Sequence, residues 1–483
     1  MIDTEALRKK IIDLAIKGKL TQQLPEDGNT EDLYTKIQAK KEELIKEGKI
    51  KKEKQQLDIV DEEIPFTIPS SWKWCRLESI FNFIDYRGAT PNKIAKGVPF
   101  VTAKNVRQGY TDYSIKEYIS EEDYLKRQSR GISHKGDLLF TTEAPMGYVA
   151  IADLERFSAG QRLITLQQYT DDPLINNKYY MYCISASFFQ KQLEEKCSGT
   201  TVKGIKADRL KLFLIPLPPI EEQCRMVNLL DSVVNQLAII DTLQHQYESD
   251  REILKGKIID AGIRGKLTEQ LLEDGNAEDL YEQIQEEKAK LIKEGKIKKE
   301  KPLPEIAKDE IPFEIPKNWK WIRWGDLSNK IQYGYNAPAK QDGRIKMVRI
   351  SDIQDGEVQW SVVPYCDIDE SEIENYLLHE NDILFARTGG TVGKSFIVSV
   401  VPEEAVYAGY LIRTSYSSRI CAQYMKYFMD SSLYWKQLRQ GTIATAQPNC
   451  NGQTLSKMIV PFPPYEEQKR IVQKIDEIMN LIS

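Results

Sequence analysis

The amino-acid sequence repeats itself at a distance of 247 positions. Residues 11–54 and 258–301 are identical at 32 of 44 positions. The match continues from residues 64–74 into 311–321 and then stops. Self-similarity over such a length indicates a duplicated structural unit, so the chain is expected to form closely related structures twice.

A second and weaker match lies at a distance of 245 positions. It joins residues 215–231 (IPLPPIEEQCRMVNLLD) to residues 460–476 (VPFPPYEEQKRIVQKID). The similar pieces therefore flank two stretches that have become different, about residues 75–215 and 322–460. A difference in specificity between the two copies is expected in these divergent blocks.

A long helix is predicted to follow the first divergent block, from Glu221 to about Ile263. Its apolar residues recur at alternating spacings of four and three, which is typical of a coiled-coil seam. The seam residues are Met226, Leu230, Val233, Leu237 and Ile240. A helix of about forty residues is about 60 Å long, so this one serves as a spacer.

A helical hairpin is predicted after each copy of the turn sequence GKL. Residues 274–276 (Asp-Gly-Asn) favour a turn, acidic residues come early and lysines late in the helix that follows, and Gly295 suits its C-terminal end. The same pattern holds for residues 26–50, where Gly48 ends the helix. Both copies then run into linkers punctuated by prolines.

The long helix has a second copy only if the two ends of the chain are considered together. Residues 466–483 match its first part, and the N-terminal residues match its second part. Under the two offsets, Ser483 corresponds to Ala238 and Met1 to Glu248, so the second copy lacks residues 239–247. We therefore predict a circular pseudo-dimer, in which two equivalent helical arms join two divergent domains about a pseudo-twofold axis.

The divergent blocks combine strand and helix patterns. Short apolar runs bounded by turns predict strands within residues 136–144, 381–390, 395–401 and 457–464. Aromatic residues at helical spacing predict helices at residues 177–195 and 418–440. Because helical periodicity indicates a buried face, these aromatics are interpreted as core residues.

Composition excludes several classes of protein. A chain of 483 residues with 41% hydrophobic residues has room for three or four domains. It lacks an apolar run of 18 residues and a signal-peptide pattern, so we expect a cytoplasmic protein. Seven scattered cysteines and three histidines support neither disulfides nor a zinc site. The net charge of −5 hides a surplus of +4 in residues 63–220.

Two short motifs resemble sites of catalysis but lack parts that the chemistry needs. GGTVGKS at residues 389–395 has three residues between Gly and Gly-Lys, whereas a phosphate-binding loop needs four. A strand-turn-strand with Lys394 near its tip is the preferred interpretation. In FPPY (residues 462–465) and LPPI (residues 217–220), no polar residue precedes the prolines to accept a hydrogen bond from an amine. Both are interpreted as rigid exits from a strand into a helix.

Several stretches together give the chain a resemblance to a known family. They are RGATPNKIAKGVPFVTAKNV (87–106), SGTTVKGIKADRLKLFLIPLPP (198–219), ARTGGTVGKSF (386–396), and the P-x-P-P-x-x-E-Q pattern that closes each block at 216–223 and 461–468. With the duplicated helical regions, the whole chain resembles the specificity subunit of a type I restriction-modification system.

The resemblance implies an α+β protein with two mixed α/β target-recognition domains. Two long antiparallel coiled-coil helical arms would separate them, with pseudo-twofold and circular organisation. The implied parts are an arm and hairpin (1–62), target-recognition domain 1 (63–220), a central helical spacer and hairpin (221–309), target-recognition domain 2 (310–465), and a C-terminal helix that completes the distal arm (466–483).

The resemblance also implies what the chain does and with what. Family members read a bipartite double-stranded DNA target, with one half-site for each recognition domain, and contain no catalytic site. They recruit two adenine-N6 methyltransferase subunits, which use S-adenosylmethionine, and restriction subunits that translocate DNA with ATP and Mg. We therefore expect no cofactor and no metal in this chain.

Polar residues on turns of the divergent blocks are the candidates for DNA contact. Arginine and asparagine can pair with two atoms of a guanine or adenine edge, and lysine more often holds phosphate. The candidates are Arg87, Thr90, Lys104, Asn105 and Arg107 in the first block, and Tyr333, Lys340, Arg349, Arg387, Thr388, Lys394 and Asn449 in the second.

Two other classes of function stay open at this point. A coiled-coil scaffold could bind other proteins through its two divergent domains. An autonomous enzyme is less favoured, because neither block offers a nucleophile, a metal cluster or a cofactor loop.

Overall fold

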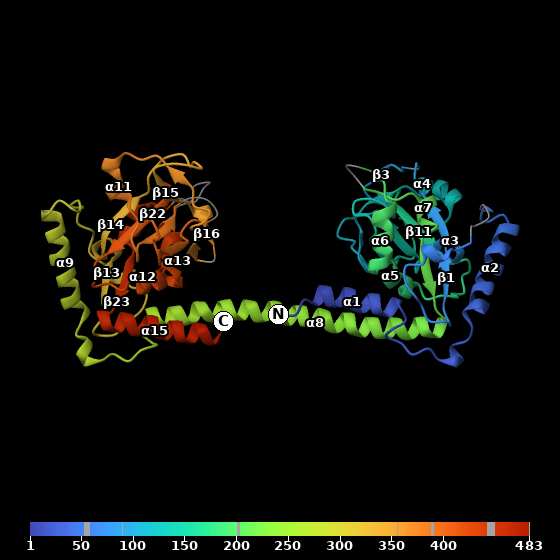
Figure 1. Ribbon diagram of the computed structural model, residues 1–483, viewed down its shortest axis with the longest axis horizontal. Helices are drawn as coiled ribbons and strands as arrows, with labels where there is room; N and C mark the ends of the chain where they lie inside the picture. Colours follow the sequence, from blue (N-terminus) through green and yellow to red (C-terminus); the bar gives the residue numbers. More distant parts are fainter. Residues whose placement is uncertain are drawn as a thin grey trace. The chain divides into compact units, whose positions relative to one another are not determined.

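The structure is a computed structural model that describes residues 1–52, 58–88, 90–199, 203–354, 356–387, 391–441 and 450–482. The chain forms two compact units, unit 1 (Met1–His245) and unit 2 (Gln246–Ser483) (Figure 1). Helix α8 (Ile220–Ile263) begins in unit 1 and ends in unit 2. Its 44 residues confirm the predicted long helix and give it a length of about 66 Å.

Unit 1 consists of a mixed α/β domain and of the duplicated helices and linkers that support it, which we call the frame. Its helices are α1 (Thr4–Ile16), α2 (Thr30–Lys46), α3 (Leu77–Ile80), α4 (Glu121–Arg127), α5 (Asn177–Ser185), α6 (Ser187–Lys196), α7 (Ala207–Leu210) and the first part of α8. Its strands are β1 (Lys73–Arg76), β2 (Asn82–Asp85), β3 (Lys93–Ile94), β4 (Val98–Val101), β5 (Val106–Arg107), β6 (Tyr110–Thr111), β7 (Tyr118–Ile119), β8 (Leu138–Thr141), β9 (Val149–Ile151), β10 (Ser158–Ala159), β11 (Leu163–Gln167) and β12 (Leu214–Leu217).

Two four-stranded sheets form the domain of unit 1, in the orders β2-β11-β8-β9 and β10-β4-β7-β3. Strands β1 and β12 pair antiparallel, with Lys73 opposite Leu217, so the two ends of the divergent block meet. The main core packs α5 and α6 between the first sheet and the helices α1 and α8. A smaller core, with Phe157 and Leu139, lies between the two sheets.

Unit 2 repeats this plan with different details. Its helices are the last part of α8, α9 (Ala277–Lys293), α10 (Trp324–Leu327), α11 (Glu370–Tyr376), α12 (Ala422–Asp430), α13 (Ser432–Gly441), α14 (Gly452–Lys457) and α15 (Tyr465–Leu481). Its strands are β13 (Lys320–Arg323), β14 (Ser328–Tyr333), β15 (Ile345–Val348), β16 (Ile353–Gln354), β17 (Glu357–Val358), β18 (Tyr365–Cys366), β19 (Ile383–Ala386), β20 (Ser395–Ile397), β21 (Ala405–Tyr407), β22 (Leu411–Tyr416) and β23 (Ile459–Phe462).

The central sheet of unit 2 has the order β14-β22-β19-β20, which matches β2-β11-β8-β9 of unit 1. Strands β13 and β23 pair antiparallel and close the second block as β1 and β12 close the first. The second sheet is smaller, with three strands in the order β18-β15-β21, and β16 and β17 form a separate hairpin. The two divergent blocks therefore share a central sheet and differ around it.

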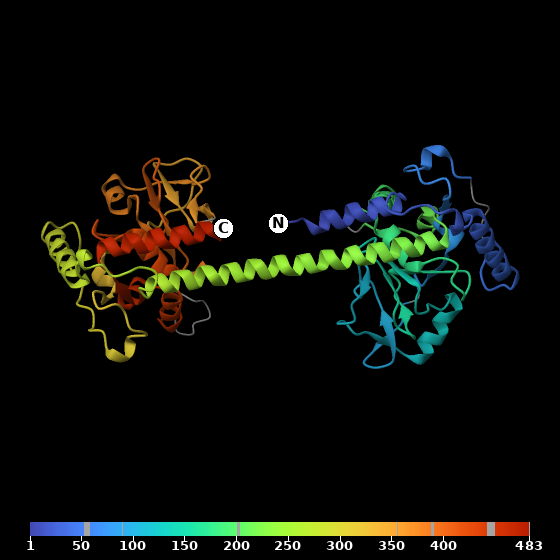
Figure 2. The same ribbon diagram turned by 90° about the horizontal axis from the view of Figure 1, so that it is seen from below.

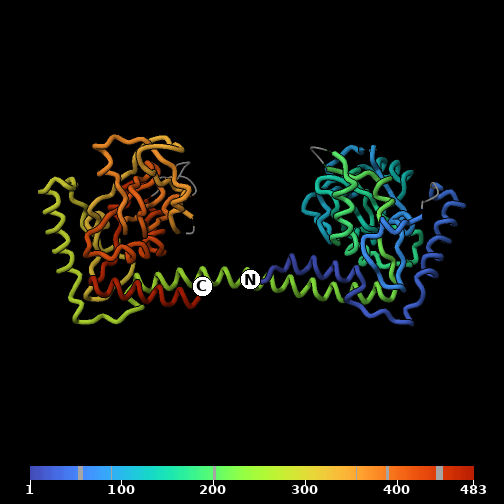
Figure 3. The backbone as a smooth tube through the Cα atoms, in the orientation of Figure 1, coloured from blue at the N-terminus to red at the C-terminus, as the bar shows by residue number. Residues whose placement is uncertain are grey.

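An antiparallel pair of helices supports each unit. In unit 1, α1 lies along the first part of α8 (Figures 1 and 2): Gln244 bonds Ile2 near one end, and Glu222 bonds Thr21 beyond the other. In unit 2, α15 lies along the last part of α8 (Figure 3), where Ile475 packs against Gly262. Because α15 corresponds to the first part of α8 and α1 to its last part, both units use the same pair. The correspondence of the two termini with residues 238 and 248 stays a prediction.

A buried glutamate ties the helix pair of unit 1 to the linker that follows. Glu222 on α8 is fully buried and accepts hydrogen bonds from Nε1 of Trp72 (2.8 Å), Oγ1 of Thr21 (2.7 Å) and Nε2 of Gln23 (2.7 Å). These donors replace the hydration that the buried carboxylate loses.

The same arrangement recurs in unit 2 with the equivalent residues. Glu467 on α15 is fully buried and accepts from Nε1 of Trp319 (2.9 Å), Oγ1 of Thr268 (3.1 Å) and Nε2 of Gln270 (3.0 Å). The duplication has therefore kept the contacts of the frame as well as its sequence.

An ion pair and a tight turn are also duplicated. Arg225 binds both oxygens of Asp27 at 2.6 Å, and Arg470 binds those of Asp274 at 2.7 and 2.6 Å. In each pair, the hydrogen bonds from the guanidinium lower the pKa of the aspartate below its ordinary value. Gly18 turns the chain at a φ of +67°, and a Cβ there would come within 2.5 Å of the ring of Pro69. Gly265 of unit 2 has a φ of +68°, and a Cβ there would come equally close to Pro316.

The predicted helical hairpins are only partly correct. Helices α2 and α9 form as expected, and Gly48 and Gly295 follow their ends with φ of 70° and 73°. However, α2 packs on α3 of the divergent block, where Gln38 donates to the Ser79 carbonyl (2.8 Å). Apolar periodicity predicts a buried face but does not say which neighbour covers it.

Each predicted aromatic helix is two helices. The break lies at Ala186 between α5 and α6, and at Ser431 between α12 and α13. At each break, an aspartate of the arm accepts a hydrogen bond from the first amide of the second helix: Asp13 from Ser187 (2.7 Å) and Asp260 from Ser432 (2.8 Å). The aromatic residues of these helices are buried as predicted, including Tyr179, Tyr180, Phe189, Tyr424, Phe428 and Tyr434.

The predicted strands and their exits are confirmed. Strands β8, β19, β20 and β23 lie within the expected ranges. In the described part of GGTVGKS, the amide of Gly393 donates to Ala386 and the amide of Ala386 to Lys394, so this segment joins β19 and β20 as a hairpin. The Pro-Pro pairs after β12 and β23 lead directly into α8 and α15.

Candidate nucleic-acid interface

Three strands of the central sheet in unit 1 meet at one end. The last residue of β2 (Asp85) stands opposite Ile164, and the last residue of β8 (Thr141) stands opposite Leu163, the first residue of β11. Because antiparallel strands alternate in direction, the residues after β2 and β8 and the residue before β11 lie at the same end. We call this end the reading end.

The reading end of unit 2 has the same construction. The last residue of β14 (Tyr333) stands opposite Ile412, and the last residue of β19 (Ala386) stands opposite Leu411, the first residue of β22. The amide of Arg387 continues the ladder by donating to the carbonyl of Tyr410 (3.2 Å). Arg387 and Tyr333, which were predicted from separate parts of the sequence, therefore lie together.

Arg387 lies over the ring of Tyr333, with the guanidinium 4.8 Å from the ring centroid. Such a cation–π contact holds the guanidinium in one place while its edge stays available. The hydroxyl of Tyr333 accepts a hydrogen bond from the amide of Gly452 (3.1 Å), which fixes the ring. Nε of Arg387 is buried and has no hydrogen-bond partner within the described ranges. Lys394 is exposed on the β19–β20 hairpin.

A hollow of about 260 Å³ opens near the reading end of unit 1. The predicted residues Thr90 and Lys104 line it together with Lys93 and Arg162. Glu117 lies among them, 2.8 Å from Nζ of Lys93 and 4.0 Å from Nζ of Lys104. Glu143 lies 3.4 Å from Nε of Arg162, so three cations face two carboxylates, and the small positive balance suits a polyanion.

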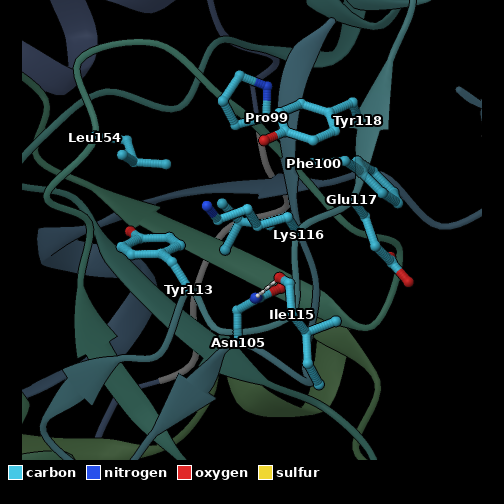
Figure 4. A pocket seen from close by; sticks show the side chains of 10 residues that line it. Pro99, Phe100, Asn105, Tyr113, Ile115, Lys116, Glu117, Tyr118 and Leu154 are labelled. Atoms are coloured by element: carbon cyan, nitrogen blue, oxygen red, sulfur yellow. Dashed lines mark hydrogen bonds between the residues drawn. The ribbon is translucent and has the colours of Figure 1, made fainter. Parts of the chain in front are cut away.

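Asn105 is not available for contact with a base. It is 2% exposed; its amide oxygen accepts from Thr102, and its amide nitrogen donates to the carbonyls of Asp112 and Ile115 (2.9 and 2.8 Å). Asn105 also borders a mainly apolar hollow of about 140 Å³ in which the bond to Ile115 is visible (Figure 4). Its role is to hold the loop before β7.

Four predicted cations are engaged with neighbouring acids. Arg87 binds Asp85 (3.0 Å) and Arg107 binds Asp112 (3.3 Å) in unit 1. In unit 2, Arg349 binds Asp352 (2.7 Å) and Lys340 binds Asp367. Their side chains are between 34% and 47% exposed, so each is partly accessible while paired. The predicted residues Thr388 and Asn449 lie outside the described residues.

Two exposed residues at the reading ends were not predicted. They are Arg162, before β11, and Tyr410, before β22. Neither β11 nor β22 was among the predicted strands, so no signal marked the positions before them. The sequence alone did not tell which strand is central or which end of it faces outward.

A buried aspartate begins the equivalent strand at the opposite end of each central sheet. Asp137 precedes β8, and burial raises its pKa to about 7. Asp382 precedes β19, and burial raises its pKa too, although Arg413 at 3.3 Å opposes the shift. The two units therefore share the acid and differ in its counter-charge.

Two further classes of site find no support in the described part of the chain. No group of three or more His, Cys, Asp or Glu side chains could hold a metal ion. No described helix combines the length and apolar character needed to cross a membrane.

Comparisons with known proteins agree on one family. The family model for the type I restriction modification DNA specificity domain matches residues 69–248 and 316–483. The chain is 27% identical to the type I restriction enzyme EcoAI specificity subunit of Escherichia coli, over 98% of this chain and 88% of that one. It is 26% identical to the EcoEI specificity subunit of Escherichia coli, over 98% and 89%.

Solved structures share the fold. The HsdS subunit from Thermoanaerobacter tengcongensis matches with a TM-score of 0.52 and 17% identity, over 87% of this chain and 92% of that one. A chain from a structure concerning complex assembly and conformational transition of the type I R-M system matches with a TM-score of 0.61 and 17% identity, over 86% and 92%.

Proposed function

The chain belongs to the type I restriction modification DNA specificity family, and we propose that it is the DNA sequence-recognition subunit of such a system. The observation that carries the proposal is the contrast between a duplicated frame and two different reading ends. The same buried glutamate supports each unit, whereas the exposed residues at the reading ends differ.

Each divergent block reads one half of a bipartite target in this proposal. The cations and the stacked arginine at the reading ends support it, because base edges in the major groove are read by such side chains. Arg387 contacts a base edge, and the exposed Lys394 holds a phosphate. Thr90 and Lys104 contact the DNA of the other half-site from the hollow of unit 1.

The frame sets the distance between the half-sites and recruits partners. Because α8 is one continuous helix, its length fixes how many base pairs between the half-sites are left unread. Two equivalent frames offer equivalent surfaces, so two methyltransferase subunits bind, and restriction subunits join them. S-adenosylmethionine, ATP and Mg belong to those partners, and the complex acts in the cytoplasm.

The chain by itself neither methylates nor cleaves DNA. This is proposed because neither Pro-Pro pair is preceded by an asparagine or aspartate that could accept a hydrogen bond from the target amine. Turnover of S-adenosylmethionine by the purified chain without partners would contradict it.

The test combines DNA binding with a map of methylated adenines. The chain is expressed with its methyltransferase subunit, and methylated adenines are located by sequencing. We expect one bipartite motif, together with salt-dependent binding that needs the partner. Arg387→Ala should relax discrimination at one position, whereas Lys394→Ala should weaken binding to all sequences and flatten its salt dependence. A complex that binds no DNA would support a protein scaffold instead.

A further inference from the structure

We propose that Arg162 and Tyr410 are specificity-determining residues, each contacting one base of the half-site that its own unit reads. The two residues precede the central strands β11 and β22. The inference rests on the proposed function and adds to it the positions at which the two half-sites are distinguished.

Hydrogen bonds of the backbone make the two positions equivalent. The carbonyl of Arg162 accepts from the amide of Thr142 (3.0 Å), the residue after β8. The carbonyl of Tyr410 accepts from the amide of Arg387 (3.2 Å), the residue after β19. Strands β11 and β22 each have a neighbour on both sides, so the backbone at these positions is held by the sheet. A side chain on such a rigid support can be aimed with precision.

Each of the two residues is the last exposed residue before a buried strand. The side chain of Arg162 is 61% exposed and Tyr410 is 68% exposed, whereas the next residues, Leu163 and Leu411, are fully buried. A tyrosine exposed to this degree contributes little to the core. Its ring is a large contact surface with little conformational entropy to lose, which suits binding.

The surroundings of each residue point to nucleic acid as the partner. Arg162 borders the hollow that also holds Lys93 and Lys104, and Tyr410 adjoins the Arg387–Tyr333 pair. Arg162 thus lies beside lysines that can hold phosphates, and Tyr410 lies beside the arginine that reads a base edge in the proposed function.

The two residues suit different bases. Glu143 lies 3.4 Å from Nε of Arg162, which orients the guanidinium and leaves its two terminal nitrogens to pair with O6 and N7 of a guanine. Tyr410 offers an aromatic ring, which suits the methyl group that thymine presents in the major groove. Equivalent positions with different chemistry are what two different half-sites require.

The test uses the full chain in complex with its methyltransferase subunits. The variants are Arg162→Ala and Tyr410→Ala, and the readouts are the methylated motif and the affinity for DNA with single base changes. Each variant should lose about 5- to 150-fold of discrimination at one base pair, in its own half-site only. The other half-site and the spacing should not change.

Matched controls lie elsewhere on the same units. Arg156 is 54% exposed and paired with Glu121. It lies on the loop after β9, which ends on the side of the sheet opposite the reading end, so Arg156→Ala should leave the motif unchanged. Val400 is 56% exposed beyond the far end of β20, and Val400→Ala should do the same. Arg162→Lys keeps the charge but not the paired donors, so it should lose discrimination even if the alanine variant folds poorly.

Three outcomes would overturn the inference. Alanine variants with the wild-type motif and discrimination would show that neither residue reads a base. A uniform loss of affinity with unchanged discrimination would assign them to phosphate. A wild-type complex that methylates no bipartite motif would refute the proposed function itself, and the inference with it.

Discussion

Unit 1 and unit 2 bury equivalent glutamates, Glu222 and Glu467, which accept hydrogen bonds from three equivalent donors. At the reading ends the units differ, because unit 1 has Arg162 where unit 2 has Tyr410. The repeated contacts belong to parts that hold the fold together. The differing residues lie on exposed connections whose change costs the fold little.

The comparison also shows that a duplicated buried charge need not have a duplicated environment. Asp137 and Asp382 occupy equivalent places at the start of β8 and β19, yet Asp382 pairs with Arg413, whereas Asp137 accepts from the amide of His134 and from Nε2 of Gln167. The two frames therefore keep the same side-chain contacts, whereas the two blocks keep the same central strands and differ in the residues that surround them.

The largest effect is expected at the buried glutamates. Glu222→Ala and Glu467→Ala each remove the acceptor of a buried tryptophan N–H and of two partly buried donors, so each should lower the unfolding free energy of its unit by about 3–5 kcal/mol. The two losses should agree within about 1 kcal/mol in chemical denaturation, because three of the donors are equivalent and the additional bond from Asn318 to Glu467 is long (3.3 Å). The exposed neighbours Glu221 and Glu466 provide controls, whose alanine variants should change stability by less than about 0.5 kcal/mol. Clearly unequal losses would mean that the frames are not equivalent.

Replacing the two buried aspartates by asparagine should change stability in opposite directions. The folded pKa of Asp137, about 7 against an ordinary 3.8, means that this group makes unit 1 less stable as pH rises from about 4 to 7. Asp137→Asn should therefore stabilise at pH 8 by about 1–3 kcal/mol and lose this advantage below pH 4. Asp382→Asn leaves Arg413 without its carboxylate and should destabilise at pH 8 by about 3 kcal/mol. Denaturation across this pH range separates the two, and equal signs would remove the distinction.

A smaller and equal effect is expected for the duplicated ion pairs. Asp27→Asn and Asp274→Asn should each cost about 1–2 kcal/mol at pH 7. The guanidinium lowers the folded pKa of each aspartate, so the stabilisation is present above the ordinary pKa of 3.8 and is lost as pH falls through the folded value. Variants and wild type should therefore converge at strongly acidic pH. A difference that persists there would show that the pairs act through packing.

The smallest effect is expected where the arm caps a helix of the block. Asp13→Ala and Asp260→Ala each leave the first amide of α6 or α13 without its acceptor, which should cost about 1 kcal/mol. Lys9→Ala, on the exposed side of α1, is the control and should be neutral in thermal unfolding. No loss in either aspartate variant would mean that the helix breaks are set within the blocks.

The frame could be predicted well because its sequence is written twice. Periodicity placed α8, and glycine and proline placed the ends of α2, α9 and both Pro-Pro exits. The breaks in the aromatic helices could not be predicted, because each depends on an aspartate more than 170 positions away in the sequence. The neighbour of α2 was missed because its contact with α3 joins segments that are separate in the sequence.

The candidate site was predicted less well, since residue type says little about burial. Lys394 is exposed on the β19–β20 hairpin and Arg387 is half-buried, whereas Asn105 is used entirely inside its own loop. Arg162 and Tyr410 were missed because their importance depends on strand order and register. Those follow from pairing between distant segments rather than from local pattern.

The central claim is that the frame is common and each block reads its half-site independently. It is tested most directly by exchanging residues 75–215 for the equivalent block of a relative and mapping methylated adenines in cells that contain the methyltransferase subunit. The account predicts that one half of the motif changes, while the other half and the number of base pairs between them stay the same. A change in both halves, or in the spacing, would contradict it.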